Sequence, residues 1–353
     1  MKACAPYIGM LIVQFAYGGS NILCKLALEN GLSYLVFIVY RHLIAMVILA
    51  PLAYLFERKN RHSLSLAILA KIFVLALFGT TIHQNLYYAG LDYTSPTVAS
   101  ALASVIPVLT FILATLLRME RISMKSKKGR AKLLGTTICI NGALIFTFWK
   151  GHQFRGFVEK PLIVVNGNVH AHEAEHERHD WIKGSVLILT SYIAFSVWLI
   201  LQGIVYKVYP AGLSMNTIIC FFAALQSSVL VLIFERNSSS WHLSWNIQLV
   251  TIIYCGTFIS CLAYYLQTIC VREKGPVFVA LFMPLLLVIV GVFSAICFAE
   301  RLHLGSLIGA FMIIFGLYCY LWGKNRDTVK DEEDKDIEEQ DERFSKIGLQ
   351  TQN

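Results

Sequence analysis

Ten strongly apolar stretches, each of about 20 residues, constrain this chain more than any other feature of its sequence. They lie near residues 6–28, 33–56, 66–90, 95–117, 132–149, 182–206, 213–234, 247–271, 276–299 and 302–322. A helix rises ~1.5 Å per residue, so about 20 residues cross ~30 Å of hydrocarbon. Only 15% of the 353 residues are charged, whereas soluble proteins carry roughly 25%. The sequence therefore predicts an all-α membrane protein with ten transmembrane helices.

The distribution of Lys and Arg predicts the direction in which the chain crosses the membrane. With the N-terminus in the cytosol, the segments that flank the helices hold 16 Lys and Arg on the cytosolic side and seven on the other side. Basic residues concentrate in cytosolic loops, so we expect both termini to be cytosolic. The sequon that begins at Asn237 then falls in an outer loop, which makes Asn237 a glycosylation candidate.

Two segments are too polar to cross a membrane. We expect residues 150–181 to form a polar, His-rich outer linker that is solvated and disordered. His172 and His176 would share a helix face, so a metal site is the alternative interpretation of this loop. Residues 324–353 carry ten Asp or Glu and six Lys or Arg, which predicts a disordered acidic tail in the cytosol. The nine cysteines form no C-x-x-C pair, so no metal site is expected from them.

The chain contains an internal repeat, because residues 1–149 and 182–323 each hold five of the ten stretches and share short strings such as Gly-Leu-Ser at 31–33 and 212–214. Five is an odd number, so the two halves must cross the membrane in opposite senses. The prediction is therefore two inverted five-helix repeats, an arrangement typical of secondary transporters that work by alternating access.

The fifth stretch of each half carries two glycines that are seven residues apart. They are Gly135 and Gly142 in the first half, and Gly309 and Gly316 in the second. Glycines at such spacing let two membrane helices approach closely.

Several longer strings resemble one family of plant membrane proteins. They include Tyr40-Arg41 and residues 84–91, 106–114, 274–279 and 305–309. On these strings, the chain resembles the plant nodulin-like, "walls are thin"-related transporters, also called "usually multiple acids move in and out" transporters. These belong to the EamA branch of the drug/metabolite transporter superfamily, and the resemblance covers roughly residues 5–323.

The resemblance implies ten helices, two EamA-like repeats, cytosolic termini and proton-driven or facilitated movement of amino acids, and in some members of auxin. The chain departs from the family at Ser104, where the family usually has Asn. A hydroxyl there replaces an amide, so the hydrogen bonds offered to a substrate would differ.

Arg41 is the sharpest candidate for a functional residue. It lies about eight residues into the second stretch, roughly 12 Å from its end. An Arg near the middle of a membrane helix costs ~2.5–3.5 kcal/mol on insertion scales, so it should face a partner or an aqueous cavity. The aligned position of the second half is near Ile219 or Cys220, without a charge. Arg41 could bind a substrate carboxylate, or it could be a structural hydrogen-bonding residue between helices.

Other polar residues within the stretches are candidate substrate ligands, because amides and hydroxyls supply both donors and acceptors. They are Gln14, Asn21, Lys25, Gln84, Asn85, Ser104, Trp198, Gln202 and Gln267. Each could instead make a helix–helix contact, and Lys25 could extend toward the membrane surface. His83 is a candidate proton relay or a neutral hydrogen-bonding residue. Pro107 and Pro284 are gating candidates because proline interrupts helices, while Pro96 and Pro276 are expected to start helices.

The sequence as a whole predicts a secondary transporter or facilitator of amino acids or related small organic acids. A transporter of auxin or another metabolite is the alternative, and a membrane receptor or enzyme is less favoured. The chain has no G-x-x-x-x-G-K-[ST] motif, and we expect no cofactor. The expected partners are a small-molecule substrate, protons as the candidate coupling ion and the lipid bilayer, with no nucleic acid. We favour the plasma membrane over the vacuolar membrane.

Overall fold

The computed structural model describes residues 4–58, 64–117, 119, 127–149, 152, 174–235, 241, 246–297 and 303–323. Within them are ten helical spans that are long and apolar enough to cross a membrane, as the sequence predicted. In the first half these spans are α1 (Ala5–Glu29), α2 (Tyr34–Glu57), α3 to α4 (Leu66–Tyr93), α5 to α6 (Pro96–Leu116) and α7 (Lys127–Phe148). In the second half they are α8 (Ala174–Val208), α9 (Gly212–Phe234), α10 to α11 (Ile247–Lys274), α12 to α13 (Pro276–Cys297) and Leu304–Gly323.

The predicted helix ends agree with the observed ones to within a few residues, except at α7 and α8. Helix α7 begins at Lys127, five residues before the predicted start at 132. Helix α8 begins at Ala174, so the last part of the predicted disordered linker is helical. The reason is that the polar residues 174–180 include Ala, Glu and Arg, which favour helix outside the membrane as well as inside it. His172, Asn237 and the acidic tail lie outside the described residues.

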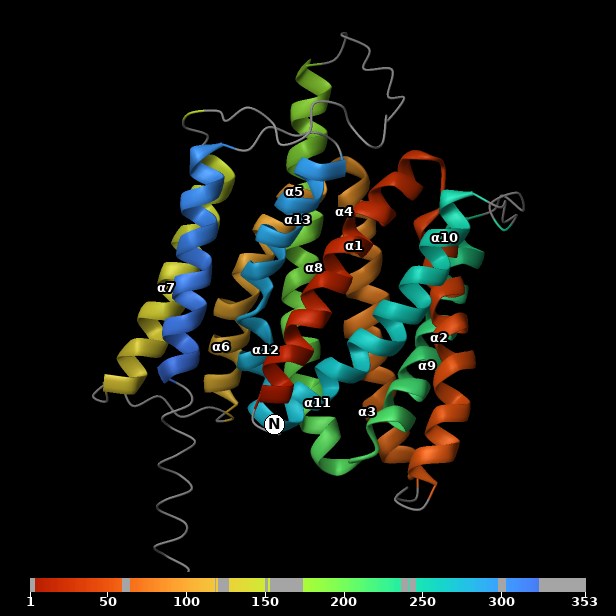
Figure 1. The fold of residues 1–353 in the computed structure, drawn as a ribbon. Coiled ribbons are helices and arrows are strands. Elements are labelled where there is room, and N and C mark those ends of the chain that lie inside the picture. Colours follow the sequence, from red (N-terminus) through yellow and green to blue (C-terminus); the bar gives the residue numbers. More distant parts are fainter. Residues whose placement is uncertain are drawn as a thin grey trace, which may run out of the picture.

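The helices form one bundle whose two halves run in opposite directions. Helix α1 begins at the end of the bundle marked N in Figure 1, whereas α8, its counterpart in the second half, ends there. We call this end the N-terminal face and the opposite end the far face. Helices α2 and α9 lie side by side, as do α4 and α8. Pro276–Cys297 is the most buried of these ten spans, because 78% of its 18-residue apolar segment lies inside the protein. It therefore forms the centre of the bundle.

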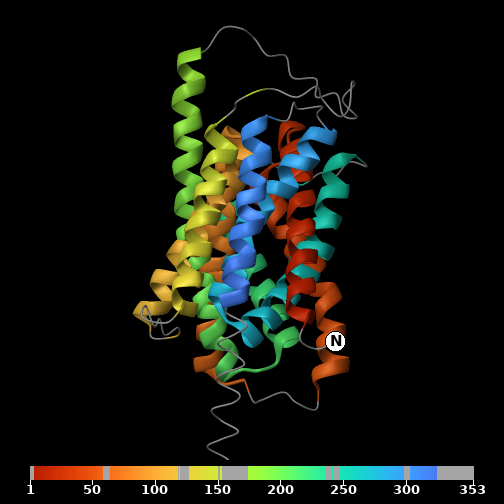
Figure 2. The same cartoon turned by 60° about the vertical axis from the view of Figure 1, so that its left-hand side comes forward.

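The last span of each half packs at one edge of the bundle. Helix α7 and the span Leu304–Gly323 lie together in both views (Figures 1 and 2). Their glycines meet: a Cβ added at Gly142 would lie 2.9 Å from the carbonyl oxygen of Gly309, and one added at Gly135 would lie 2.6 Å from that of Gly316. The predicted role of these glycines in close helix packing is confirmed, because any side chain there would collide with the neighbouring backbone.

The third span of each half contains a π-helical segment. Segment η2 (Leu77–Ile82) lies between α3 (Leu66–Ala76) and α4 (His83–Tyr93), and η5 (Cys255–Ala263) lies between α10 (Ile247–Tyr254) and α11 (Tyr264–Lys274). Such segments are uncommon inside helices and frequently accompany functional sites. Here they occur at corresponding positions of the two halves.

The fourth span of each half is broken. In the first half, a 3₁₀ turn, η3 (Ala103–Val105), separates α5 (Pro96–Leu102) from α6 (Ile106–Leu116). In the second half, residues 281–282 separate α12 (Pro276–Ala280) from α13 (Met283–Cys297). Pro107 and Pro284 are each the second residue after the break. Proline lacks the N–H that would continue the preceding helix, which accounts for both breaks. Pro96 and Pro276 start helices, as predicted.

Candidate functional site

A cavity lies between the two halves, at the level of the π-helical segments and the broken helices. Its volume of about 60 Å³ leaves room for a few water molecules. Seven spans contribute to it: the first four spans of the first half, and three of the second half, which are α8, α10 to α11 and α12 to α13. The lining residues are Tyr17, Ser20, Asn21, Arg41, His83, Gln84, Tyr87, Tyr88, Ala103, Ile106, Tyr192, Phe195, Ile259, Tyr264, Met283 and Leu286.

Arg41 is the only cation among these lining residues. Its side chain is 1% exposed. Its Nε donates to the hydroxyl of Ser260 at 3.0 Å and its Nη1 donates to the hydroxyl of Tyr88 at 2.6 Å. Both partners are neutral, and no Asp or Glu lines the cavity within the described part of the chain. Arg41 therefore presents an uncompensated positive charge. Its guanidinium also has N–H donors that take no part in these two bonds.

Aromatic rings surround the guanidinium of Arg41. Its central carbon lies 5.6 Å from the ring centroid of Phe37 and 5.9 Å from that of Tyr88. The two rings meet edge to face, with centroids 5.1 Å apart. Attraction between a cation and these rings helps to hold Arg41 within the membrane without a carboxylate partner.

A chain of hydrogen bonds crosses the cavity beside Arg41. The Nε2 atom of His42 lies 3.2 Å from Oε1 of Gln84, and the amide nitrogen of Gln84 donates to the hydroxyl of Tyr264. Gln84 is thereby fixed between the first half and the second. It lies at the cavity wall, where a substrate ligand is expected, although each amide atom already has a protein partner.

Asn21 forms a second fixed amide on the far-face side of the cavity. Its Nδ2 donates to the hydroxyl of Ser100 at 3.3 Å, and its Oδ1 accepts from the hydroxyl of Tyr87 at 2.9 Å. Asn21 and Tyr87 both line the cavity. Helices α1, α4 and α5 are thus joined through one amide side chain.

His83 belongs to an aromatic wall on the α8 side of the cavity. Its ring centroid lies 4.8 Å from that of Phe195, 6.0 Å from Tyr87 and 6.2 Å from Tyr192. Its Nδ1 lies 3.1 Å from the carbonyl oxygen of Ser191. A carbonyl only accepts, so this contact assigns the proton of the neutral ring to Nδ1. The remaining nitrogen, Nε2, is the one that could take up a proton.

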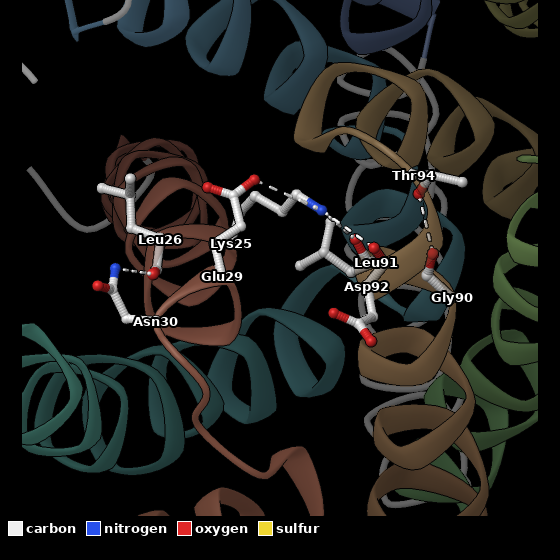
Figure 3. Close-up of polar contacts among 8 residues, drawn as sticks. All are labelled: Lys25, Leu26, Glu29, Asn30, Gly90, Leu91, Asp92 and Thr94. Atoms are coloured by element: carbon white, nitrogen blue, oxygen red, sulfur yellow. Dashed lines mark hydrogen bonds and ion pairs between the residues drawn. The ribbon is translucent and has the colours of Figure 1, made fainter. Parts of the chain in front are cut away.

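Lys25 does not line the cavity but joins α1 to α4 near the far face (Figure 3). Its Nζ donates to the carbonyl oxygens of Leu91 and Asp92, both at 3.1 Å, and lies 3.7 Å from the carboxylate of Glu29. These bonds use two carbonyls in the last turn of α4, of which that of Leu91 also accepts from the backbone N–H of Thr94 at 3.3 Å. The contacts fit a structural link between helix ends.

The other predicted ligands also lie away from the cavity wall. Asn85 donates to the carbonyl oxygen of Thr81, 2.7 Å away, and Ser104 is buried in η3 directly after the lining residue Ala103. Gln14, Trp198, Gln202 and Gln267 are all fully or almost fully buried, on the N-terminal side of the cavity. The structure therefore groups Arg41, Asn21, His83 and Gln84 at one cavity and sets the remaining candidates apart.

Sequence reasoning missed the tyrosines of the cavity. Tyr17, Tyr87, Tyr88, Tyr192 and Tyr264 all line it. A tyrosine in an apolar stretch is easily taken for a residue at the membrane surface, where this residue is common. The sequence pattern could have revealed three of them, because Tyr17 shares a helix face with Asn21, and Tyr87 and Tyr88 share one with Gln84.

The family comparison matches both halves of the chain. The model of the EamA-like transporter family matches residues 5–148 and again residues 182–322. The chain is 40% identical over 343 residues to "WAT1-related protein At5g64700" of Arabidopsis thaliana, which covers 95% of this chain and 94% of that protein. It is 38% identical over 326 residues to "Protein WALLS ARE THIN 1" of the same plant, covering 91% of this chain and 83% of that protein.

A solved structure has the same fold. A crystal structure of a protein with 14% sequence identity superimposes with a TM-score of 0.63, covering 90% of this chain and 96% of that one. At this identity the likeness concerns the fold alone. The double family match, the relatives and the ten spans around one polar cavity together establish that the chain belongs to the EamA-like transporter family, as a WAT1-related, multi-pass membrane transporter.

Proposed function

We propose that the protein is a secondary transporter or facilitator that moves amino acids or related small organic acids by alternating access. The observation that carries this proposal is Arg41, a buried cation at the cavity whose hydrogen-bond partners, Ser260 and Tyr88, are both neutral. An arginine within a membrane pairs with an opposite charge or with backbone carbonyls, or it faces a cavity that takes up polar groups. A substrate carboxylate supplies the missing negative charge, and the planar guanidinium fits its two oxygens.

The rest of the cavity suits the remainder of such a molecule. Amide and phenol oxygens of Asn21, Gln84 and Tyr264 lie around it, and these can accept hydrogen bonds from an ammonium group. The inverted repeat supports alternating access, since exchange of the conformations of the two halves opens the cavity to the other face. We place both termini in the cytosol and the protein in the plasma membrane, on the distribution of Lys and Arg and on the family resemblance.

The test is uptake and efflux of labelled amino acids and organic acids in proteoliposomes, with and without a pH gradient. We expect saturable flux of at least one carboxylated substrate in the unmodified protein. Arg41→Met should abolish this flux while the protein elutes as a folded species in detergent. Arg41→Lys retains the charge without the planar fork, and should keep a reduced flux. Absence of saturable flux of any acid, or full flux in Arg41→Met, would refute the proposal.

A second candidate substrate is an aromatic monocarboxylate such as auxin. The observation that favours it is the wall formed by His83, Tyr87, Tyr192 and Phe195, together with the absence of a lining carboxylate within the described residues. Aromatic rings bind planar rings in offset or edge-to-face contacts. Inhibition of flux by indole-type acids, compared with inhibition by aliphatic amino acids, separates the two candidates. Phe195→Leu should weaken inhibition by the aromatic acids only.

His83 is our candidate for the group that couples transport to protons. The Nδ1 atom of His83 contacts the carbonyl oxygen of Ser191, which leaves Nε2 as the atom that can take up a proton. The ring lines the cavity. His83→Gln retains a polar side chain but cannot gain a proton at neutral pH. We expect this variant to exchange substrate across the membrane yet lose accumulation driven by a pH gradient. Equal accumulation by His83→Gln and the unmodified protein would assign coupling elsewhere.

A further inference from the structure

A group of buried polar side chains lies between the cavity and the N-terminal face. Gln14 is three residues before the lining residue Tyr17 on α1, which begins at that face. Gln267 is three residues after the lining residue Tyr264 on α11, and Gln202 follows Phe195 on α8 by two helical turns; both helices end at that face (Figure 1). All three amides are therefore on the same side of the cavity, and each is 0% exposed.

Hydrogen bonds link Gln202 and Gln267, but not Gln14, to side chains of neighbouring helices within the described residues. The hydroxyl of Thr268 accepts from the amide of Gln202 at 2.9 Å and from that of Asn216, on α9, at 3.2 Å. Next to Thr268, the Oε1 of Gln267 accepts from the hydroxyl of Tyr17 on α1, 3.3 Å away. We call Gln14, Gln202, Asn216, Gln267 and Thr268 the inner polar cluster.

The cluster is incompletely satisfied. Both amide atoms of Gln14, the Oε1 of Gln202 and the Nε2 of Gln267 are buried and have no hydrogen-bond partner among the residues that the structure describes. Unpaired polar atoms are unfavourable in any protein interior, and more so inside a membrane where water cannot reach them. Four such atoms on three neighbouring helices indicate a space that polar groups enter in another conformation.

Trp198 packs against two residues of the cavity wall on the side of the inner polar cluster. It lies on α8 between Phe195 and Gln202, is 1% exposed and does not line the cavity. Its ring centroid lies 5.3 Å from that of Phe195 and 5.5 Å from that of Tyr264. These packed rings continue the aromatic wall of the cavity by one helical turn toward Gln202.

We infer that the inner polar cluster is a second, transient substrate subsite on the N-terminal side of a barrier formed by Trp198 and Tyr264. It receives the polar end of the same small organic acid after the acid leaves Arg41. Amide groups can donate to a carboxylate and accept from an ammonium group. The cluster carries no charge, so it holds the acid less firmly than Arg41 does and releases it. The inference rests on the proposed function for the identity of the substrate, but not for the location of the route.

The first test separates binding from passage. Gln202→Met and Gln267→Met remove the amides while keeping the size and flexibility of the side chains. We expect equilibrium binding of the transported acid in detergent to stay within about twofold, and flux to fall by at least tenfold. Arg41→Met is the matched comparison, because it should abolish binding as well. Unchanged flux in both Met variants, or a loss of flux together with lowered thermal stability, would overturn the inference.

The second test needs no substrate, so it separates failure of the inference from failure of the proposed function. Asn216→Cys is treated with a membrane-impermeant thiol reagent supplied from the N-terminal face, and labelling at residue 216 is followed by peptide mass spectrometry. The native Cys220 is the internal control, since it is 0% exposed and packs with Ala45 and Leu49 of α2. We expect residue 216 to be labelled at least tenfold faster than Cys220. Equal rates at the two positions would show that no route reaches the cluster.

Discussion

Glu57 and Glu235 stand at the ends of two neighbouring helices, α2 and α9, and each binds the beginning of the helix that the other one ends. Glu57, at the end of α2, accepts hydrogen bonds from the backbone N–H groups of Leu213 at 2.9 Å and Ser214 at 2.7 Å, in the first turn of α9. Glu235, directly after α9, accepts from the hydroxyl of Ser33, which precedes α2, at 2.9 Å. Helices α2 and α9 are counterparts in the two halves, so this antiparallel pair is fastened at both faces of the bundle.

Replacement of Glu57 should destabilise the protein more than replacement of Glu235. Glu57→Gln removes a negative charge from the positive end of α9 and keeps only one acceptor oxygen, where two backbone donors were satisfied. We expect a loss of ~0.5–2 kcal/mol. Thermal unfolding in detergent measures it, with Glu235→Gln as the matched control because Glu235 contacts a side-chain hydroxyl instead. A larger effect of the control would contradict the assignment.

The two neutral partners of Arg41 should affect substrate affinity as well as stability. Tyr88→Phe and Ser260→Ala each delete one hydrogen bond that orients the guanidinium. Bonds of this charge-assisted kind contribute ~1.5–3 kcal/mol, so we expect the KM of the carboxylated substrate to rise roughly tenfold or more. Tyr192→Phe is the control, since Tyr192 lines the same cavity but donates to the backbone of Ala99. Similar KM values in Tyr88→Phe and the control would argue against an orienting role.

The glycine contact between α7 and the last span should tolerate no larger side chain. At Gly142 a Cβ would lie 2.8 Å from the Cβ of Met312, and at Gly309 it would lie 2.6 Å from the carbonyl oxygen of Gly142. Overpacking of this kind costs about 1–3 kcal/mol. Gly142→Leu should therefore lower the midpoint of thermal unfolding, whereas Leu144→Ala, at a 49% exposed position of the same helix, should leave it almost unchanged.

A side chain at Gly79 should disturb the Trp198 barrier. Gly79 lies in η2, and a Cβ there would overlap the indole ring of Trp198. We expect Gly79→Ala to displace the ring, shift its fluorescence and speed the labelling of Asn216→Cys severalfold. The double variant Gly79→Ala with Trp198→Leu has room for the new methyl group, so its thermal stability should recover. Unaltered fluorescence in Gly79→Ala would mean that the backbone of η2 moves to accommodate the methyl group and that the ring of Trp198 stays in place.

The ten helices could be predicted because each residue's preference for lipid acts locally, and about 20 such residues suffice to define a span. The irregular parts of these helices could not be predicted from the sequence. Nothing in the local sequence distinguishes the π-helical segments η2 and η5 from regular helix, since they depend on packing against other spans. Pro284 explains why the helix is interrupted near residues 281–282. The fold decides that the interruption ends directly before Met283.

Four residues that line the cavity, Arg41, Asn21, His83 and Gln84, could be named as candidates from the sequence, but only Arg41 was singled out among many polar residues. Arg41 stands out because a cation in an apolar stretch needs an explanation. Tyr88 and Ser260 contact it from 47 and 219 residues away along the chain, and only the packing of three helices brings them together. The same holds for Gln202 and Gln267, which carry the expected chemistry but lie beyond Trp198 and not at the cavity wall.

The π-helical segments also affect how this family can vary by gain or loss of residues. A π-helical turn holds one residue more than an α-helical turn, so deletion of one residue within Leu77–Ile82 or Cys255–Ala263 would restore a regular helix with both flanks in register. Elsewhere in these spans the same deletion would rotate everything beyond it by about 100°. Both segments directly precede lining residues, His83 in one half and Tyr264 in the other. A one-codon change at either place could therefore reshape the cavity while the bundle around it stays intact.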